Sequence, residues 1–238
     1  MALFRDQGVV LRTIKLGETD RIVTILTQGH GKIRAVAKGI RKPGSRFGAR
    51  LEPTSHIALL CYRGRSELDV VTQVETIDAN RAVREHYASL THAVSMLEAT
   101  DQVAQDREPS PALYRMLVGA LRTLADRPAS LVSAAFFWKL LSLEGFHPVL
   151  DNCARCGGDG PFTAFDVGEG GALCEACGRH AARPVRPESL ALLRRILGGG
   201  LAGALSEPPG ATTTEVERLA LVTLEHHLER RLRSAALL

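Results

Sequence analysis

Residues 8–50 of this chain have the sequence GVVLRTIKLGETDRIVTILTQGHGKIRAVAKGIRKPGSRFGAR. Here and in the next thirty residues, short β-branched or alternating runs are separated by turns rich in Gly, Asp and Pro. The pattern predicts strands at 9–11, 22–27, 33–37, 57–62 and 68–74. Five such strands are typical of a small closed or nearly closed barrel, for which the OB-fold is the commonest arrangement.

After Asp78 the pattern becomes helical, because apolar residues recur every three to four positions. Residues 131–145 are apolar around most of a helix, which predicts a core helix with Trp138 inside it. A last helix is expected to open with a capping box at Thr214–Glu217. We therefore predict an α+β protein, with a five-stranded OB-fold over residues 1–79 and an α-helical domain over residues 80–238.

Two C-x-x-C pairs lie seventeen residues apart, which is a spacing typical of a tetrahedral zinc site. The predicted ligands are Cys153, Cys156, Cys174 and Cys177. Four thiolates leave no open coordination position, so one structural Zn²⁺ is expected in a zinc knuckle at residues 150–183. Gly157 and Gly178 each follow a second cysteine, where the turn is expected to need positive φ.

The alternative for these cysteines is a pair of disulfides, which would require an oxidising compartment. The N-terminus has no apolar signal segment, and no apolar run reaches the length of a membrane span. Zinc in a cytoplasmic protein is therefore the favoured interpretation. Cys61 lies in an apolar run and is expected to be a buried free thiol.

The formal net charge of +4 is unevenly distributed. Residues 1–50 hold eleven Lys and Arg against three acidic residues, and no acid occurs between Lys32 and Arg50. This asymmetry predicts that the N-terminal part of the chain binds polyanions and that the remainder is close to neutral. Within this segment, Phe47 could stack on a base. The alternative interpretation of the segment is a solvent-exposed basic loop without a binding role. The candidate nucleic-acid contacts in this segment are Lys32, Arg34, Lys38, Arg41, Lys42, Arg46 and Arg50.

The sequence contains no recognisable catalytic motif, so no catalytic residue is assigned and an enzyme is not expected. The segment Gly29–Ile33 lacks the spacing and the Ser/Thr of a phosphate-binding loop. Glu18 and Asp20 could form the acidic pair of a metal-dependent nuclease. Two carboxylates beside Thr19 more often cap a turn, however, and we prefer that interpretation.

Several short motifs follow one another along the first fifty-three residues: Gly8–Leu11, Glu18–Val23, Leu26–Thr27, Gly31–Lys32, Ala37–Lys42, Arg46–Gly48 and Leu51–Pro53. In their order and spacing they resemble the N-terminal domain of the bacterial RecO family of recombination mediators. The helical body with its four-cysteine knuckle is similar too, so the resemblance covers essentially the whole chain.

This resemblance implies a nucleoid-associated DNA repair and recombination protein. Such proteins bind single- and double-stranded DNA without sequence specificity and anneal complementary strands. They cooperate with RecR and the single-strand-binding protein SSB to place RecA on DNA. The resemblance implies that the basic OB surface falls on Lys32, Arg34, Lys38, Arg41, Lys42 and Arg46, with Arg12 and Arg21 as weaker members. It does not place the residues that dock RecR or the SSB tail.

The residues alone leave one other class open, an RNA- or ribosome-associated structural protein, because OB barrels and four-cysteine knuckles are frequent there. Matched DNA and RNA oligomers would separate the two classes, since RNA-specific recognition uses the 2′-hydroxyl.

Overall fold

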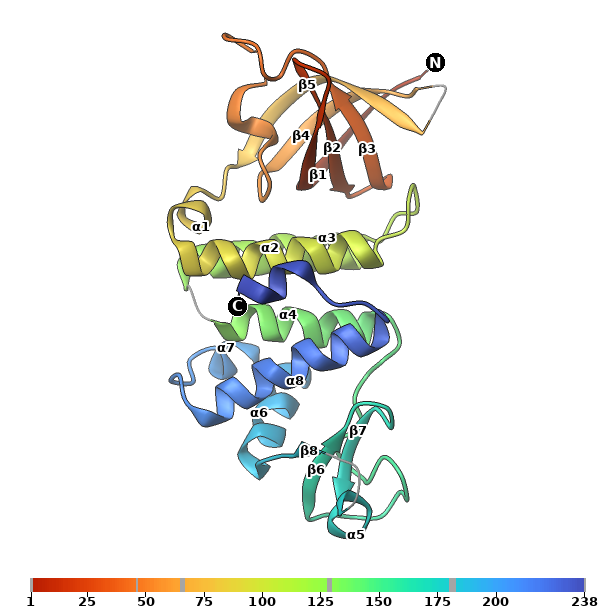
Figure 1. Cartoon of the computed structure of the whole chain (residues 1–238), viewed down its shortest axis with the longest axis vertical. Coiled ribbons are helices and arrows are strands. Elements are labelled where there is room, and N and C mark those ends of the chain that lie inside the picture. Colours follow the sequence, from red (N-terminus) through yellow and green to blue (C-terminus); the bar gives the residue numbers. More distant parts are fainter. Residues whose placement is uncertain (1, 46, 65–66, 128–129, 180–182, 238) are drawn as a thin grey trace. The chain divides into compact units, whose positions relative to one another are not determined.

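The computed structural model describes residues 2–45, 47–64, 67–127, 130–179 and 183–237 (Figure 1). The chain forms two compact units, one over Met1–Pro128 with Ala236–Leu238 and the other over Ala129–Ala235. The first unit holds the barrel together with the first helices. The functional boundary predicted at residue 79 lies inside this unit and stays a prediction.

Five strands form a closed barrel in the order β1-β2-β3-β5-β4 (Figure 1). The strands β3 and β5 pair in parallel and the other neighbours pair antiparallel. The long strand β1 pairs with both β2 and β4 and so closes the barrel. This confirms the predicted five-stranded OB-type barrel. The strands are β1 (Leu3–Leu16), β2 (Asp20–Thr27), β3 (Gly31–Ala37), β4 (His56–Tyr62) and β5 (Leu68–Asp78).

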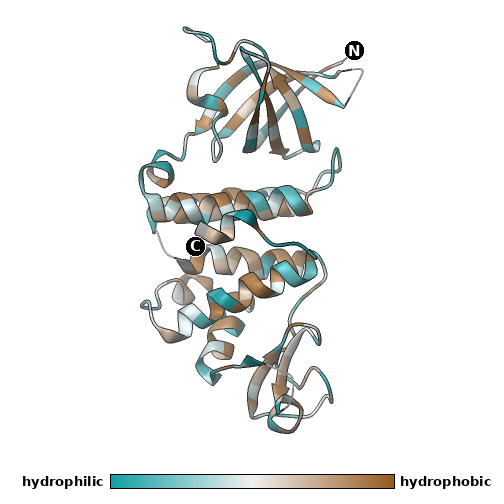
Figure 2. Cartoon of the chain, in the orientation of Figure 1, coloured by the Kyte–Doolittle hydropathy of each residue, from teal (hydrophilic) through white to brown (hydrophobic). Residues whose placement is uncertain are grey.

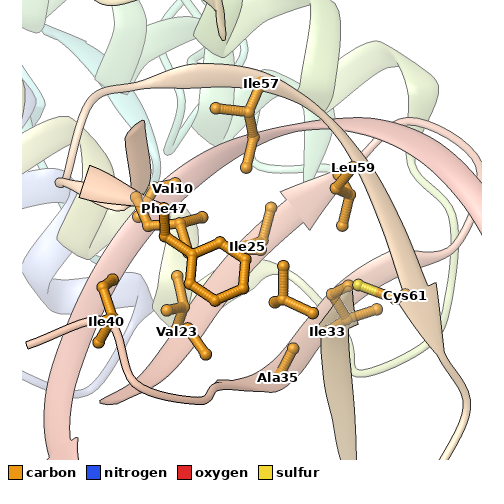
Figure 3. Packing of buried hydrophobic residues seen from close by; sticks show 13 residues of the cluster. Val10, Val23, Ile25, Ile33, Ala35, Ile40, Phe47, Ile57, Leu59 and Cys61 are labelled. Carbon is orange, nitrogen blue, oxygen red and sulfur yellow. The ribbon is translucent and has the colours of Figure 1, made fainter. Parts of the chain in front are cut away.

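The barrel core is built by alternation along the strands, since successive residues of a strand point to opposite faces. Every second residue of β3 is buried. Phe47, on the connection between β3 and β4, is only 1% exposed and packs among Val23, Ile25 and Ile40 (Figure 3). The prediction that Phe47 stacks on a base is therefore wrong, because its ring fills the barrel core. The free thiol of Cys61 is buried in the same core, as expected.

Three helices belong to the same unit: α1 (Arg81–Glu85), α2 (Tyr87–Val103) and α3 (Pro111–Asp126). The connection between α2 and α3 lies against the start of β3. The backbone N–H of Lys32 donates to the Gln105 carbonyl at 3.3 Å, and the N–H of Arg107 donates to the Lys32 carbonyl at 2.9 Å. These backbone bonds join the barrel to the helices that follow it.

The second unit has α4 (Ser130–Leu143) at its core, and apolar residues line much of this helix in Figure 2. Trp138 is fully buried, and its indole N–H donates to the Val216 carbonyl at 3.4 Å. The predicted core helix is thus confirmed. The other elements are β6 (Phe162–Asp166), β7 (Gly171–Cys174), α5 (Glu175–Gly178), β8 (Arg183–Pro184), α6 (Pro187–Leu197), α7 (Leu201–Ala204) and α8 (Ala211–His227). The terminal turn η2 (Arg233–Leu237) begins in this unit and ends in the first one.

Two features of this unit differ from the sequence-based expectation. The helix α8 begins at Ala211, and the Thr213 hydroxyl accepts the Gly210 N–H at 2.9 Å, so the cap predicted at Thr214 is wrong. The knuckle segment also contains a three-stranded sheet in the order β7-β6-β8, with Phe165 and Leu173 buried in it. Among the residues the structure describes, no helix is long and apolar enough to span a membrane.

Candidate nucleic-acid interface and metal centre

The connection that follows β3 carries the densest group of exposed cations in the predicted set. Lys38, Arg41 and Lys42 are all exposed there. We call residues 38–45 the basic loop. It is held against the turn between β1 and β2, because the Arg41 N–H donates to the Thr19 carbonyl at 3.0 Å and the Arg41 guanidinium donates to the Glu18 carbonyl at 2.9 Å.

Asp20 is the side chain that anchors the basic loop. Its carboxylate accepts the Gly39 N–H at 2.7 Å and the Thr19 hydroxyl at 2.8 Å. The Gly39 N–H chiefly lowers the pKa of Asp20, and the Thr19 hydroxyl and the charges of Lys38 and Lys42 lower it further. Asp20 therefore stays ionised and caps the turn. This is the role that we preferred from the sequence, over that of an acidic pair in a nuclease.

Four of the predicted cations lie on the barrel strands and face carboxylates. Arg12 contacts Asp101 at 2.5 Å, Arg21 contacts Glu52 at 3.2 Å, and Arg34 lies 3.9 Å from Glu67. Lys32 lies 3.6 Å from both Asp101 and Asp106, and its side chain is only 16% exposed. Arg46 lies outside the described residues. The structure thus brings Lys38, Arg41 and Lys42 together on the basic loop, and Arg21 lies at the base of that loop, opposite Ala37.

Two further arginines, Arg81 and Arg84, were not predicted as contacts. Arg50, Arg81 and Arg84 line one hollow beside the barrel. A sequence signal exists for Arg50, which ends the acid-free segment. No such signal exists for the other two, because only the folded chain brings α1 next to residues 47–50.

The four predicted zinc ligands converge in the second unit. The Sγ atoms of Cys153, Cys156, Cys174 and Cys177 all lie within 4.8 Å of one another. The Cys156 and Cys174 sulfurs are 3.8 Å apart. A tetrahedral ion with Zn–S bonds of about 2.3 Å places its sulfurs about 3.8 Å apart. The four thiols therefore fit a tetrahedral metal ion.

Local backbone structure orients these four thiols toward a common point. The first knuckle closes with the Gly157 N–H donating to the Cys153 carbonyl at 2.8 Å, and Gly157 has a φ of +73° as predicted. Gly178 is not among the positive-φ glycines, so its predicted role is wrong. A Cβ at Gly178 would lie 2.9 Å from the Ala164 Cβ, and close packing on β6 is the reason that glycine fits there.

The protonation of the cysteines also favours a bound cation. Backbone hydrogen bonds, foremost from Cys174, lower the pKa of Cys153 to about 6. Hydrogen bonds with the Cys156 and Cys174 thiols raise the pKa of Cys177 to about 12. Four thiolates so close together repel one another, and a divalent cation is what allows all of them to ionise.

Arg155 links the two halves of this site, which the sequence did not indicate. Its Nη1 donates to the Cys177 carbonyl and its Nε donates to the Glu169 carboxylate, both at 3.0 Å. Outer partners of this kind orient metal ligands. Within the described ranges, the four cysteines form the only group of three or more His, Cys, Asp or Glu side chains that converges at metal-binding distance.

Comparison with known proteins places both parts of the chain in one family. Residues 1–80 match the family model "Recombination protein O N terminal", and residues 84–236 match "Recombination protein O C terminal". The DNA repair protein RecO of Frankia casuarinae is 44% identical over 238 residues, which cover 98% of this chain and 97% of that protein. A barrel with an anchored basic loop, a four-cysteine centre and similarity along the whole chain lead to one conclusion: this chain belongs to the RecO family of DNA repair proteins.

Proposed function

We propose that this protein is a non-enzymatic recombination mediator that binds single- and double-stranded DNA without sequence specificity through its barrel. The observation that carries the proposal is the exposed basic loop, which Asp20 fixes to the barrel at Gly39. Cations on an anchored loop neutralise phosphates and release counterions, which gives affinity that does not depend on sequence. The same mechanism needs no nucleotide hydrolysis.

Lys38, Arg41 and Lys42 are the central contacts in this proposal, and Arg46 continues the same segment. Arg12, Arg21 and Arg34 could each exchange a carboxylate partner for a phosphate, so they are secondary contacts. Lys32 is held under the α2–α3 connection by Asp101 and Asp106, and its main contribution is to that packing. The barrel over residues 1–79 is the DNA-binding part.

The proposal also includes the annealing of complementary DNA strands and the loading of RecA onto DNA. A protein that screens phosphate charge and holds two strands brings complementary DNA together. Membership of the RecO family supports cooperation with RecR and SSB in placing RecA on DNA. The same membership favours DNA repair over the RNA- or ribosome-associated alternative.

The four cysteines are proposed to hold one structural Zn²⁺. Their spacing fits tetrahedral thiolate coordination, and four protein ligands leave no position for water or substrate. The ion would supply ordering free energy to the knuckle and no reaction chemistry. Arg155 would orient the second knuckle toward the ion.

The test of DNA binding is fluorescence anisotropy of a labelled oligothymidine across a salt series. For the wild type, contacts by about four cations predict a slope of log affinity against log salt near −3, at about −0.7 per contact. The double variant Arg41→Glu/Lys42→Glu should flatten this slope, and Arg115→Glu/Arg218→Glu is the matched control on exposed positions of α3 and α8. Equal slopes for both double variants would overturn the assignment of the surface.

Annealing is tested with the same variants. Two complementary labelled strands should anneal faster with wild-type protein, and the basic-loop variant should lose this acceleration while the control keeps it. Adding matched RNA strands separates the two function classes, since preference for the 2′-hydroxyl would favour an RNA partner. Activity that needs ATP, or cleavage of the strands with Mg²⁺, would contradict a non-enzymatic mediator.

A further inference from the structure

An open hollow of about 420 Å³ lies in the first unit, beside the barrel and apart from the basic loop. Its walls come from the turn η1 (Gly48–Leu51) on one side and, some 25 residues further along the chain, from the end of the barrel strand β5 and the short helix α1 that follows it (Figure 1). The lining residues are Phe47, Gly48, Ala49, Arg50, Ser55, Thr76, Ala79, Arg81 and Arg84. Three of them are arginines and none is a carboxylate.

Two arginines of the hollow, Arg81 and Arg84, differ from those on the barrel strands. Arg12 and Arg21 each face a carboxylate within 4.0 Å. Arg84 instead donates to the Ser55 hydroxyl at 3.0 Å, a neutral partner that fixes the guanidinium against the barrel. Arg81 is exposed and makes no hydrogen bond or ion pair with any residue in the described parts of the chain. The like charges of Arg81 and Arg84 beside one hollow repel each other, and a bound anion relieves that repulsion.

The chemistry of the lining selects a phosphate group. Guanidinium groups bind phosphate oxygens through paired, charge-assisted hydrogen bonds. Gly48 and Ala49 keep the wall free of large side chains. Phe47 is the one aromatic residue of the lining, and because it is 1% exposed it offers no apolar anchor for a peptide. These features favour a repeating phosphodiester over an acidic protein segment.

We propose that this hollow binds a backbone phosphate of a nucleic-acid strand, so that the interface continues from the basic loop past the barrel onto α1. Arg50 supports this continuity, since it ends the acid-free segment that contains the basic loop. Arg81 and Arg84 supply the cations on the far wall. This inference rests on the proposed DNA binding and extends it to residues outside the barrel.

The experiment measures binding of an oligothymidine of about 16 nucleotides, the upper range for one OB-fold, across a salt series. Arg81→Gln should weaken binding about tenfold and reduce the magnitude of the salt slope by about 0.7, the value for one phosphate contact on a single strand. Arg81→Lys should retain the slope, because it keeps the charge. Arg115→Gln is the matched control, since Arg115 is an exposed arginine of α3 in the same unit. Arg50→Gln provides a second variant on the opposite wall.

The possible results separate this inference from the proposed function. If Arg41→Glu/Lys42→Glu and Arg81→Gln each weaken DNA binding, the result supports both the proposed function and the phosphate site in the hollow. Loss with the basic-loop variant alone, while Arg81→Gln and Arg50→Gln behave as Arg115→Gln does, overturns the hollow and leaves the proposed function intact. No wild-type binding to DNA overturns both. If Arg81→Gln weakens binding of an oligoglutamate peptide while leaving the DNA slope unchanged, the hollow is a site for acidic protein segments and the phosphate assignment is wrong.

Discussion

At the scale of single residues, buried or anchored polar groups control the properties of the first unit. Asp20 fixes the basic loop through Gly39, and its acceptor role depends on its negative charge. His56 is buried at the end of the barrel, where its Nε2 lies 2.7 Å from the Tyr114 hydroxyl. Each of these contacts joins residues that are distant in the sequence, and each can be tested by changing one side chain.

Replacing Asp20 with Asn should loosen the basic loop. A neutral amide is a weaker acceptor for the Gly39 N–H than a carboxylate is. We expect hydrogen exchange at the Gly39 amide to become about three- to tenfold faster. Because the folded pKa of Asp20 is lowered, its contribution is present above the pKa of the unfolded chain and is lost as the pH falls through the folded value. Glu18→Gln is the control, and equal protection in both variants would contradict the anchoring role.

His56 should make the free energy of unfolding depend on pH. Burial chiefly lowers its pKa and nearby Arg122 lowers it further, while Asp78 acts in the opposite direction. An unfolded histidine titrates near about 6.5, so below that pH the unfolded chain binds more protons than the folded one. Urea unfolding should therefore show stability falling from about pH 7 to about pH 5, with a smaller fall for His56→Gln. An unchanged pH dependence in that variant would show that other groups cause it.

At the scale of elements, the turn between β2 and β3 meets the α2–α3 connection. Gly31 has a φ of +67°, and a Cβ there would lie 2.2 Å from the Glu108 carbonyl oxygen. Nearby, Arg107 contacts the fully buried carboxylate of Asp69 at 3.2 Å. The barrel and the first helices are therefore joined by backbone as well as by charge.

Gly31→Ala should destabilise the first unit more than an equivalent change elsewhere. The left-handed backbone costs an L-residue about 1–2 kcal/mol, and the clash with Glu108 adds to that cost. Gly44→Ala is the matched control, since Gly44 has a φ of +74° but nothing within 4 Å of its added Cβ. Thermal unfolding should rank the variants in the order wild type, Gly44→Ala, Gly31→Ala. Equal losses of thermal stability in the two variants would show that the α2–α3 connection adjusts to the added Cβ without a free-energy penalty.

At the scale of the whole molecule, charge and metal divide between different parts of the chain. The cations concentrate in residues 1–50, whereas the four cysteines lie in the second unit. In the proposed function, the basic residues attract polyanions to the barrel, and a metal ion bound by the four cysteines stabilises the knuckle. DNA binding and metal binding should therefore respond to different perturbations.

Removing the metal should unfold the knuckle while the barrel stays folded. Structural zinc in small modules supplies on the order of 10 kcal/mol of apparent binding free energy. Treatment with a strong chelator, or Cys174→Ser, should remove amide protection from β6 and β7 and lower the unfolding temperature of the second unit. Hydrogen exchange with mass spectrometry reports each unit separately, and metal analysis should give one zinc per chain. Full protection of β6 and β7 after metal removal would contradict the structural role.

The sequence by itself determined the five strands, the core helix and the four-cysteine cluster. Patterns among residues close in the sequence indicate each of these features. Alternation of apolar residues predicts a strand, apolar periodicity predicts a helix, and the C-x-x-C spacing sets the ligand geometry. The acid-free run of cations likewise marked the basic loop.

Only the tertiary structure decided which cations are available and which side chains are buried. Lys32 meets Asp101 across 69 residues, Phe47 enters the barrel core, and Arg81 and Arg84 join Arg50 around one hollow. The small sheet of the knuckle was also not predicted, because its apolar residues are few and its strands short. The physical reason is that burial and ion pairing depend on partners distant in the sequence, whereas residue patterns report only on near neighbours.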